Sequence, residues 1–310
     1  MKIAVIIPTK NRPALLKKCI ESLARQNYPK SEYEIIIVDD GSDTGEAEYI
    51  VSGASKNFKN VNVRYVKQAC KGPAAARNNG VKNTSATIVA FIDDDCTASR
   101  NWLKSIDVAF SVNKDAWAVE GKTMTNGRIG PFSHYVINEN GRMFVTCNMA
   151  FKKSALNMVG FFDERFKRAN REDSDIAFSI IEKGGSIVFS KKSVVKHANL
   201  VRSFSASLRR KTYYMWDVLL IKKHPQLYRK FIKFPFERFT PLYIMFSLMA
   251  VTNPLFFVAL IITAYAEIIY RRHSCGIYDY IKFLFLQIFG SFLVVLSALY
   301  GVYRFRGLRK

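Results

Sequence analysis

Short apolar runs alternate with more polar stretches along the first hundred residues. Four of these runs are apolar throughout or rich in β-branched residues: 3–7, 33–38, 61–66 and 87–92. Runs that are apolar on both faces are typical of buried parallel strands. Residues 13–23 carry apolar side chains at helical spacing, residues 73–81 predict a short helix, and Pro8 is expected to end the first strand. The alternation predicts an α/β fold with a mainly parallel central sheet.

The chain changes character towards its end. Residues 117–195 predict a mixture of strands and helices, whereas 200–238 are basic and aromatic. This basic stretch is typical of amphipathic helices at a membrane interface, although helices packed against a globular domain would fit nearly as well. We therefore expect three parts: a catalytic domain at 1–199, interfacial helices at 200–238 and a hydrophobic membrane region at 239–310.

Two apolar stretches, 241–270 and 283–303, are long enough to cross a bilayer and predict about two transmembrane helices. Asn253 and Pro254 interrupt the first stretch, which would make it a kinked span or a re-entrant hairpin. Basic residues follow both stretches, so the positive-inside rule does not choose between these topologies. Two buried helices of a soluble protein are the weaker alternative.

The formal net charge of +22 admits nucleic acid, an anionic membrane or phosphorylated substrates as partners. Many basic residues lie between 191 and 238, just before the apolar tail, which favours a membrane surface on the cytoplasmic side. Nucleic-acid binding is an alternative raised by charge alone, and the tail argues against it. The five scattered cysteines predict no disulfide framework, which fits a reducing compartment. The first apolar run is too short for a signal-peptide core, so we expect the catalytic domain to be cytoplasmic.

Acidic residues follow two of the predicted strands. Asp93, Asp94 and Asp95 end one strand, where three carboxylates repel one another unless a cation or hydrogen bonds compensate. Mg²⁺ or Mn²⁺ would suit them, and a solvated acidic turn is a comparable interpretation. Asp39 and Asp40 end another strand, where they would bind a base or ribose or simply make a turn.

Three further features have both a structural and a chemical interpretation. Arg77 follows three alanines and would reach a phosphate or an acidic neighbour, or else belong to a plain surface helix. Glu172 and Asp173 would cap a helix or supply a general base. His197 is structural or a third metal ligand. No dinucleotide-binding or Walker glycine loop follows the first strand.

The motifs occur in a fixed order that resembles the family-2 glycosyltransferases of the GT-A fold. The resemblance covers roughly the first two thirds of the chain and rests on residues 6–12, 38–42, 75–80, 91–95, 148–151, 159–166, 172–176 and 197. The family often has arginine after its Glu-Asp motif, where this chain has Ser179. This departure concerns the acceptor side of the site.

The resemblance implies a role for each matching residue. Asp173 would be the catalytic base with Glu172 beside it, and Asp93, Asp95 and His197 would hold Mn²⁺ or Mg²⁺. The expected nucleotide-sugar contacts are Pro8, Thr9, Asn11, Arg12, Asp39, Asp40, Ser42, Ala74, Arg77, Asn78, Asp93 and Asp94.

These roles imply an inverting, metal-dependent transfer of sugar from a nucleotide-diphosphate sugar. The apolar tail points to a lipid-linked or glycan acceptor at the cytoplasmic face of a cell membrane. No Gln-x-x-Arg-Trp motif is present, which favours single addition over polymerisation. A nucleotidyltransferase and a non-catalytic membrane protein that binds nucleotide sugars are the alternatives.

Overall fold

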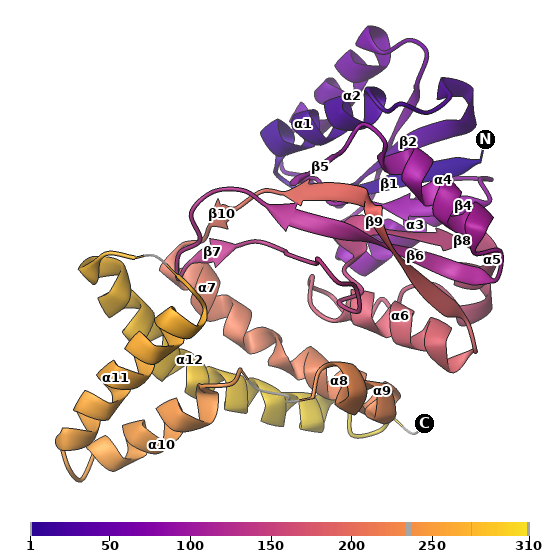
Figure 1. Ribbon diagram of the computed structural model, residues 1–310. Coiled ribbons are helices and arrows are strands. Elements are labelled where there is room, and N and C mark those ends of the chain that lie inside the picture. Colours follow the sequence, from indigo (N-terminus) through magenta and orange to yellow (C-terminus); the bar gives the residue numbers. More distant parts are fainter. Residues whose placement is uncertain (1, 234–236, 274, 309–310) are drawn as a thin grey trace. The chain divides into compact units, whose positions relative to one another are not determined.

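The computed structural model describes residues 2–233, 237–273 and 275–308, which form two compact units (Figure 1). The first unit comprises Met1–Asn126 and Val136–Ala198. The second comprises Gly127–Tyr135 and Asn199–Lys310. The division into three parts that the sequence predicts stays a prediction.

The first unit is built on one eight-stranded sheet in the order β3-β2-β1-β4-β8-β6-β9-β5. The strands are β1 (Ile3–Thr9), β2 (Tyr33–Asp39), β3 (Asn62–Lys67), β4 (Ile88–Phe91), β5 (Cys96–Ala98), β6 (Ala116–Thr125), β8 (Met149–Lys152) and β9 (Ser186–His197). β1 to β4 are parallel, as are β6 and β9, whereas β8 runs antiparallel to β4 and β6 and β5 runs antiparallel to β9. The mainly parallel sheet is confirmed.

Helices connect these strands and cover the sheet (Figure 1). They are α1 (Pro13–Ala24), α2 (Glu46–Asn57), α3 (Pro73–Lys82), α4 (Trp102–Val112), α5 (Lys153–Val159) and α6 (Glu172–Glu182). The central strands β1, β2 and β4 are almost completely buried, as their continuous apolar runs predict. The carboxyl ends of these three strands lie at one edge of the sheet, where parallel α/β proteins bind ligands.

The sequence predicts that the first strand ends at Pro8, and this prediction is wrong. β1 continues to Thr9 in register with β2. β4 accompanies β1 only as far as Ile6. Thr9 turns its carbonyl to β2, where it accepts from the Asp40 N–H, so Pro8 faces the other side. Because β4 has ended there, the N–H that proline lacks is not needed for pairing.

The second unit consists mainly of helices. They are α7 (Phe204–Lys211), α8 (Met215–Lys223), α9 (Pro225–Phe231), α10 (Thr240–Ala250), α11 (Leu255–Tyr270) and α12 (Ile277–Arg304), with a short pairing of β7 (Ser133–His134) and β10 (Leu200–Val201). Within residues 2–233, 237–273 and 275–308, α12 alone is long and apolar enough to cross a membrane. The other predicted span is divided into α10 and α11 by a turn at 251–254.

Close packing of α3 on β1 provides a test of the fold. A Cβ added at Gly80 of α3 would lie 2.5 Å from a side-chain carbon of Ile6, whereas one added at Gly53 of α2 would meet nothing within 4 Å. We expect Gly80→Ala to lower the free energy of unfolding by about 1–3 kcal/mol. Gly53→Ala is the matched control and should raise it by up to about 1 kcal/mol, because alanine favours helix. Urea unfolding of both variants measures the difference, and equal effects would contradict the packing.

Candidate active site

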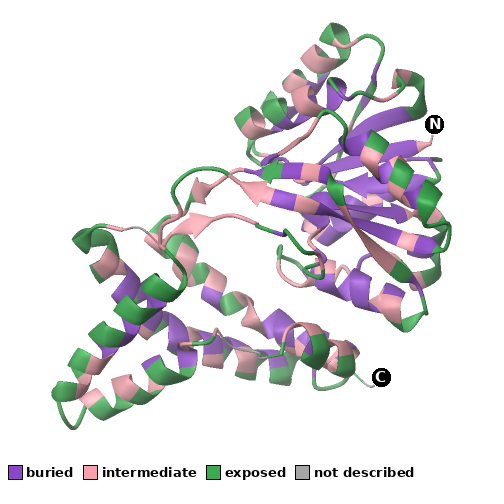
Figure 2. Ribbon diagram, in the orientation of Figure 1, coloured by how far each residue is buried: buried purple, intermediate pink, exposed green. Residues whose placement is uncertain are grey.

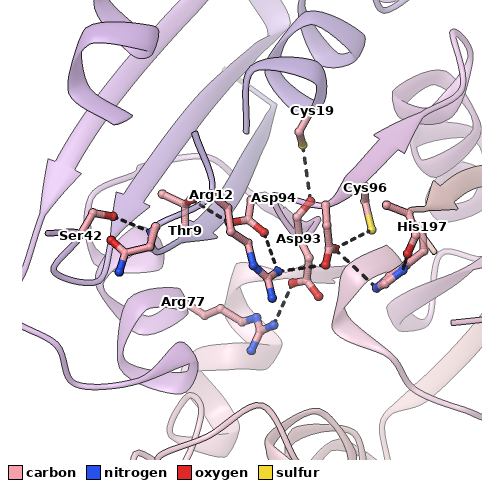
Figure 3. Close-up of polar contacts among 12 residues, drawn as sticks. Thr9, Arg12, Cys19, Ser42, Arg77, Asp93, Asp94, Cys96 and His197 are labelled. Carbon is pink, nitrogen blue, oxygen red and sulfur yellow. Dashed lines mark hydrogen bonds and ion pairs between the residues drawn. The ribbon is translucent and has the colours of Figure 1, made fainter. Parts of the chain in front are cut away.

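Loops from three parallel strands meet at the carboxyl edge of the sheet (Figure 3). Thr9 ends β1, Asp39 ends β2, and Asp94 lies in the turn that follows β4. The Thr9 hydroxyl donates to Asp94 Oδ2 at 2.7 Å. The topology of the sheet therefore joins motifs that are up to 85 residues apart in the sequence.

The three consecutive aspartates make ion pairs with two arginines. Asp93 accepts from Arg77 Nη2 at 3.0 Å. Asp94 and Asp95 both accept from Arg12 Nη1, at 3.1 and 2.9 Å. Burial nevertheless raises the pKa of Asp94 to about 7. Arg12 and Arg77 thus offset part of the repulsion between the three carboxylates, for which the sequence analysis considered a metal ion.

Arg77 joins this turn to the start of α6. Its Nη1 donates to Glu172 Oε1 at 3.0 Å, and both residues are only 3% exposed. Glu172 Oε2 and Arg77 Nε are buried without a hydrogen-bond partner. Burial raises the pKa of Glu172 to about 7, and the nearby charge of Asp173 acts in the same direction. An ion pair with this little access to water holds α3, the turn after β4 and α6 together.

Asp173 is the second residue of α6 and is partly exposed, unlike Glu172. The N–H of Ser174 donates to its Oδ1 at 2.7 Å, and the helix N-terminus stabilises its negative charge. Desolvation acts against these effects and raises its pKa. An accessible carboxyl group of raised pKa beside the acidic turn has the properties of a general base.

Asp95 and His197 form a second pair, built by the antiparallel register of β5 with β9. His197 Nδ1 lies 2.7 Å from the carbonyl oxygen of Ala198, which only accepts, so Nδ1 carries a proton. Nε2 then lies 3.5 Å from Asp95 Oδ1. Two such atoms attract each other only with a proton or a cation between them, and imidazole with carboxylate is a donor set that Mn²⁺ accepts.

Asp39 and Asp40 are held rigidly at the end of β2. Asp39 accepts from the Ser42 N–H at 2.8 Å and from the Tyr65 hydroxyl at 2.6 Å. Asp40 accepts from Gln68 Nε2 at 2.8 Å and from the N–H groups of Lys71 and Gly72 at 2.7 and 2.9 Å. These bonds fix the loop that precedes α3.

Asn11 and Ser42 lie in the loops that follow β1 and β2. The Asn11 N–H donates to the Ser42 hydroxyl at 3.0 Å, and the Asn11 side chain exchanges hydrogen bonds with Asp43 at 2.7 and 2.9 Å. Asn11 adopts φ 54°, a conformation that asparagine tolerates better than most residues. The loop after β1 is therefore fastened to the loop after β2.

Ala74 and Asn78 face the interior of the first unit. Ala74 is buried in the first turn of α3. The Asn78 amide donates to the Phe162 carbonyl and to Glu164, at 2.9 and 3.0 Å, and accepts from the Phe162 N–H. The expected contacts of Ala74 and Asn78 with a nucleotide sugar stay predictions.

The edge of the sheet collects an excess of acid. Five carboxyl groups lie around the turn after β4 and the start of α6, where Arg12 and Arg77 make ion pairs with four of them and the charge of Arg171 acts on Asp173. The acids are Asp93, Asp94, Asp95, Glu172 and Asp173. Such an arrangement favours a further cation or protonation of some of the acids.

Tyr65 and Gln68 hold the two aspartates of β2, and the sequence analysis did not identify them. Tyr65 lies within β3, the neighbour of β2, and Gln68 directly follows that strand. Polar residues at the end of that third predicted strand are the signal that would have found them.

Comparison with known proteins decides the family. Residues 4–106 match the family described as glycosyl transferase family 2, and residues 96–302, more than half of the chain, match glycosyl transferase family group 2. The chain belongs to glycosyl transferase family group 2. The family resemblance that the ordered motifs carry is thereby confirmed.

Curated relatives match parts of this glycosyl transferase. Glycosyltransferase AglE of Haloferax volcanii is 37% identical over 102 residues, which cover 33% of this chain and 33% of AglE. Chondroitin synthase of Pasteurella multocida is 25% identical over 284 residues, which cover 74% of this chain and 28% of that protein. This chain spans less than two thirds of the length of either relative.

Solved structures share the fold of this glycosyl transferase. Mannosyltransferase PcManGT from Pyrobaculum calidifontis, in complex with GDP-Man and Mn²⁺, has a TM-score of 0.69 at 18% identity, covering 96% of this chain and 87% of that one. Residues 1–349 of S. aureus TarS, in complex with UDP-GlcNAc, have a TM-score of 0.56 at 15% identity, covering 100% and 93%. The predicted GT-A fold is confirmed.

The raised pKa of Glu172 predicts a dependence of stability on pH. The folded state favours the protonated acid, so the stability that this group contributes is present below its unfolded pKa of about 4.5 and lost as pH rises through about 7. Glutamine does not ionise. Between pH 5 and 8, the difference in free energy of unfolding between Glu172→Gln and the native protein should therefore shift in favour of the variant by on the order of 1–3 kcal/mol, on top of the constant cost of removing the partner of Arg77. Urea unfolding across this range measures it.

Glu46→Gln is the matched control, because Glu46 is exposed in the first turn of α2. Its effect on the free energy of unfolding should stay nearly constant over the same range. A constant effect of Glu172→Gln as well would contradict the buried, proton-binding state of Glu172.

Proposed function

We propose that this protein transfers a sugar from a nucleotide-diphosphate sugar to an acceptor hydroxyl, with inversion at the anomeric carbon. The observation that carries the proposal is the chain of contacts from Asp93 through Arg77 to Glu172. It sets an acidic turn beside Asp173, an accessible carboxylate at the start of a helix. Membership in the transferase family favours this reaction over nucleotidyl transfer.

The donor would bind along the carboxyl edge of the sheet. The rim made by Pro8, Thr9, Asn11, Asp40 and Ser42 would receive the nucleoside, as the ends of parallel strands do in α/β proteins. Arg12, Arg77, Asp39, Ala74, Asn78 and Asp94 complete the proposed nucleotide-sugar set. The solved neighbours hold GDP-Man or UDP-GlcNAc, so the base and the sugar of this donor are left to measurement.

Asp95, His197 and Asp93 would hold Mn²⁺ or Mg²⁺. The fit rests on the Asp95 Oδ1 to His197 Nε2 approach, which calls for a positive charge, and on the half-buried Asp93 carboxyl beside it. When bound, such an ion would neutralise charge on the diphosphate as a Lewis acid. Arg12 Nη1 donates to Asp95 Oδ2, whereas Asp95 Oδ1 is the oxygen that faces His197.

Asp173 would take the proton of the acceptor hydroxyl. The raised pKa of this carboxyl group makes it a stronger base, and the N-terminus of α6 keeps its charged form populated. Glu172 would position α6 through Arg77. Attack from the side opposite the leaving group would invert the anomeric configuration.

The acceptor is proposed to be lipid-linked or a glycan at the cytoplasmic face of a cell membrane. α12 supports this placement, since it is long and apolar enough to cross a bilayer. The basic residues that precede the apolar helices would face anionic headgroups. The first unit would then work in the cytoplasm.

Turnover of the donor tests the proposed reaction. Protein purified in mild detergent would be mixed with UDP-, GDP- and dTDP-sugars and a membrane lipid extract, with and without Mn²⁺, and free nucleotide would be assayed. We expect metal-dependent release from one donor. A complete lack of release and of nucleotide binding would rule the transferase function out.

Substitution of the base tests the role of Asp173. Asp173→Asn keeps the shape of the side chain but cannot accept the proton, so kcat should fall by about 10²–10⁴-fold. Asp115→Asn is the matched control at an exposed aspartate and should leave kcat unchanged. Full turnover in Asp173→Asn would show that another group accepts the proton.

A further inference from the structure

The hairpin of α10 and α11 in the second unit presents apolar side chains to its surroundings. Figure 2 shows exposed stretches along both helices. Large side chains lie among them, including Leu248, Val251, Leu255, Val258, Ile262 and Ile269. A soluble helix pair would carry polar residues on that face.

The buried side of the hairpin contains charge. Glu267 of α11 is completely buried. It accepts from the Tyr243 hydroxyl of α10 at 2.9 Å and from Gln287 Nε2 of α12 at 3.2 Å. The residues around it on this side are mostly apolar, such as Leu260 and Ala264, so the hairpin buries a carboxyl group while its outer face is apolar.

An ion-pair network joins the two ends of the hairpin. Glu237 precedes α10 and Arg271 follows α11, and Arg271 Nη2 donates to Glu237 Oε2 at 3.0 Å. Lys211 Nζ donates to the other Glu237 oxygen at 2.8 Å, and Arg271 Nε donates to Glu267 at 2.7 Å. The chain therefore enters and leaves the hairpin at the same level, which we call the base.

The helices are too short to cross a bilayer separately. α10 has 11 residues and α11 has 16. At 1.5 Å per residue they extend about 16 and 24 Å. The hydrocarbon core measures about 30 Å, so a hairpin of this length ends within it.

The segment 251–255, which we call the tip, pairs its backbone N–H groups. Pro254 has no N–H to leave unpaired. The other four N–H groups donate within the hairpin: Val251 to Leu248 O, Thr252 and Asn253 to Met249 O, and Leu255 to Asn253 Oδ1. The Thr252 hydroxyl also donates to Met249 O. Hydrocarbon offers no hydrogen bonds, so these internal bonds lower the cost of burying the tip in lipid.

We propose that α10 and α11 enter an anionic bilayer from one side and return to it as a re-entrant hairpin. The tip lies in hydrocarbon, and the Glu237–Arg271 base stays at the headgroups. Arg238, Arg271 and Arg272 surround the base with positive charge, which complements anionic lipid. This inference rests on the membrane placement proposed above and is independent of sugar transfer.

Single-cysteine labelling tests the hairpin in the full chain. Cys70 and Cys275 would be replaced by serine, and Cys19, Cys96 and Cys147 are buried. Cysteines would then be placed at Val251 in the tip, at Arg272 beside the base and at Val112 in the first unit. Val112 is the matched control, since Val251 and Val112 are 83% and 75% exposed in the protein alone.

The labelled variants would be reconstituted in vesicles of phosphatidylcholine and phosphatidylglycerol. An environment-sensitive fluorophore at position 251 should shift to shorter wavelength and be quenched by lipids that carry a nitroxide in mid-chain, whereas the fluorophore at 112 should report water. A membrane-impermeant maleimide should reach positions 272 and 112 from the same side of the vesicle.

Two results would overturn the inference. A fluorophore at position 251 that reports water would show that the tip stays outside the bilayer. Access to position 272 from the side opposite to 112 would show that the segment crosses instead of returning. Neither result depends on turnover, so failure here leaves the proposed transferase reaction to its own test.

Discussion

The buried guanidinium of Arg77 is the contact on which the candidate active site depends. It links Asp93 after β4 to Glu172 at the start of α6, and it lies 5.8 Å from the centre of the Phe162 ring. Loss of one partner of such a pair would leave an uncompensated buried charge, which is strongly destabilising. The acidic turn and the proposed base are therefore positioned by one side chain.

Small residues allow Arg77 to reach this place. Gly72 before α3 adopts φ 97°, and a Cβ there would lie 2.6 Å from the Lys167 carbonyl oxygen. Gly80 lets the same helix lie directly on Ile6 of β1. The glycines and alanines of this segment thus serve backbone approach, which in turn sets where the guanidinium points.

The sequence predicts the first four strands and two of the helices because their apolar patterns are local. It also predicts which acids gather at the sheet edge, since parallel strands end together. The pairing of those acids depends on contacts across long separations, such as the 95 residues between Arg77 and Glu172. Hydropathy likewise cannot show that residues 240–270 fold back on themselves, whereas the Arg271–Glu237 ion pair joins the two ends of that segment.

Binding of Mn²⁺ and nucleotide to the same edge tests the central claim most directly. Free Mn²⁺ would be measured by electron paramagnetic resonance during titration of the native protein and of Asp95→Asn, with and without UDP or GDP. The account predicts that one nucleotide tightens Mn²⁺ binding in the native protein and that Asp95→Asn abolishes this coupling. Equal Mn²⁺ binding with and without every nucleotide, or coupling that survives Asp95→Asn, would contradict it.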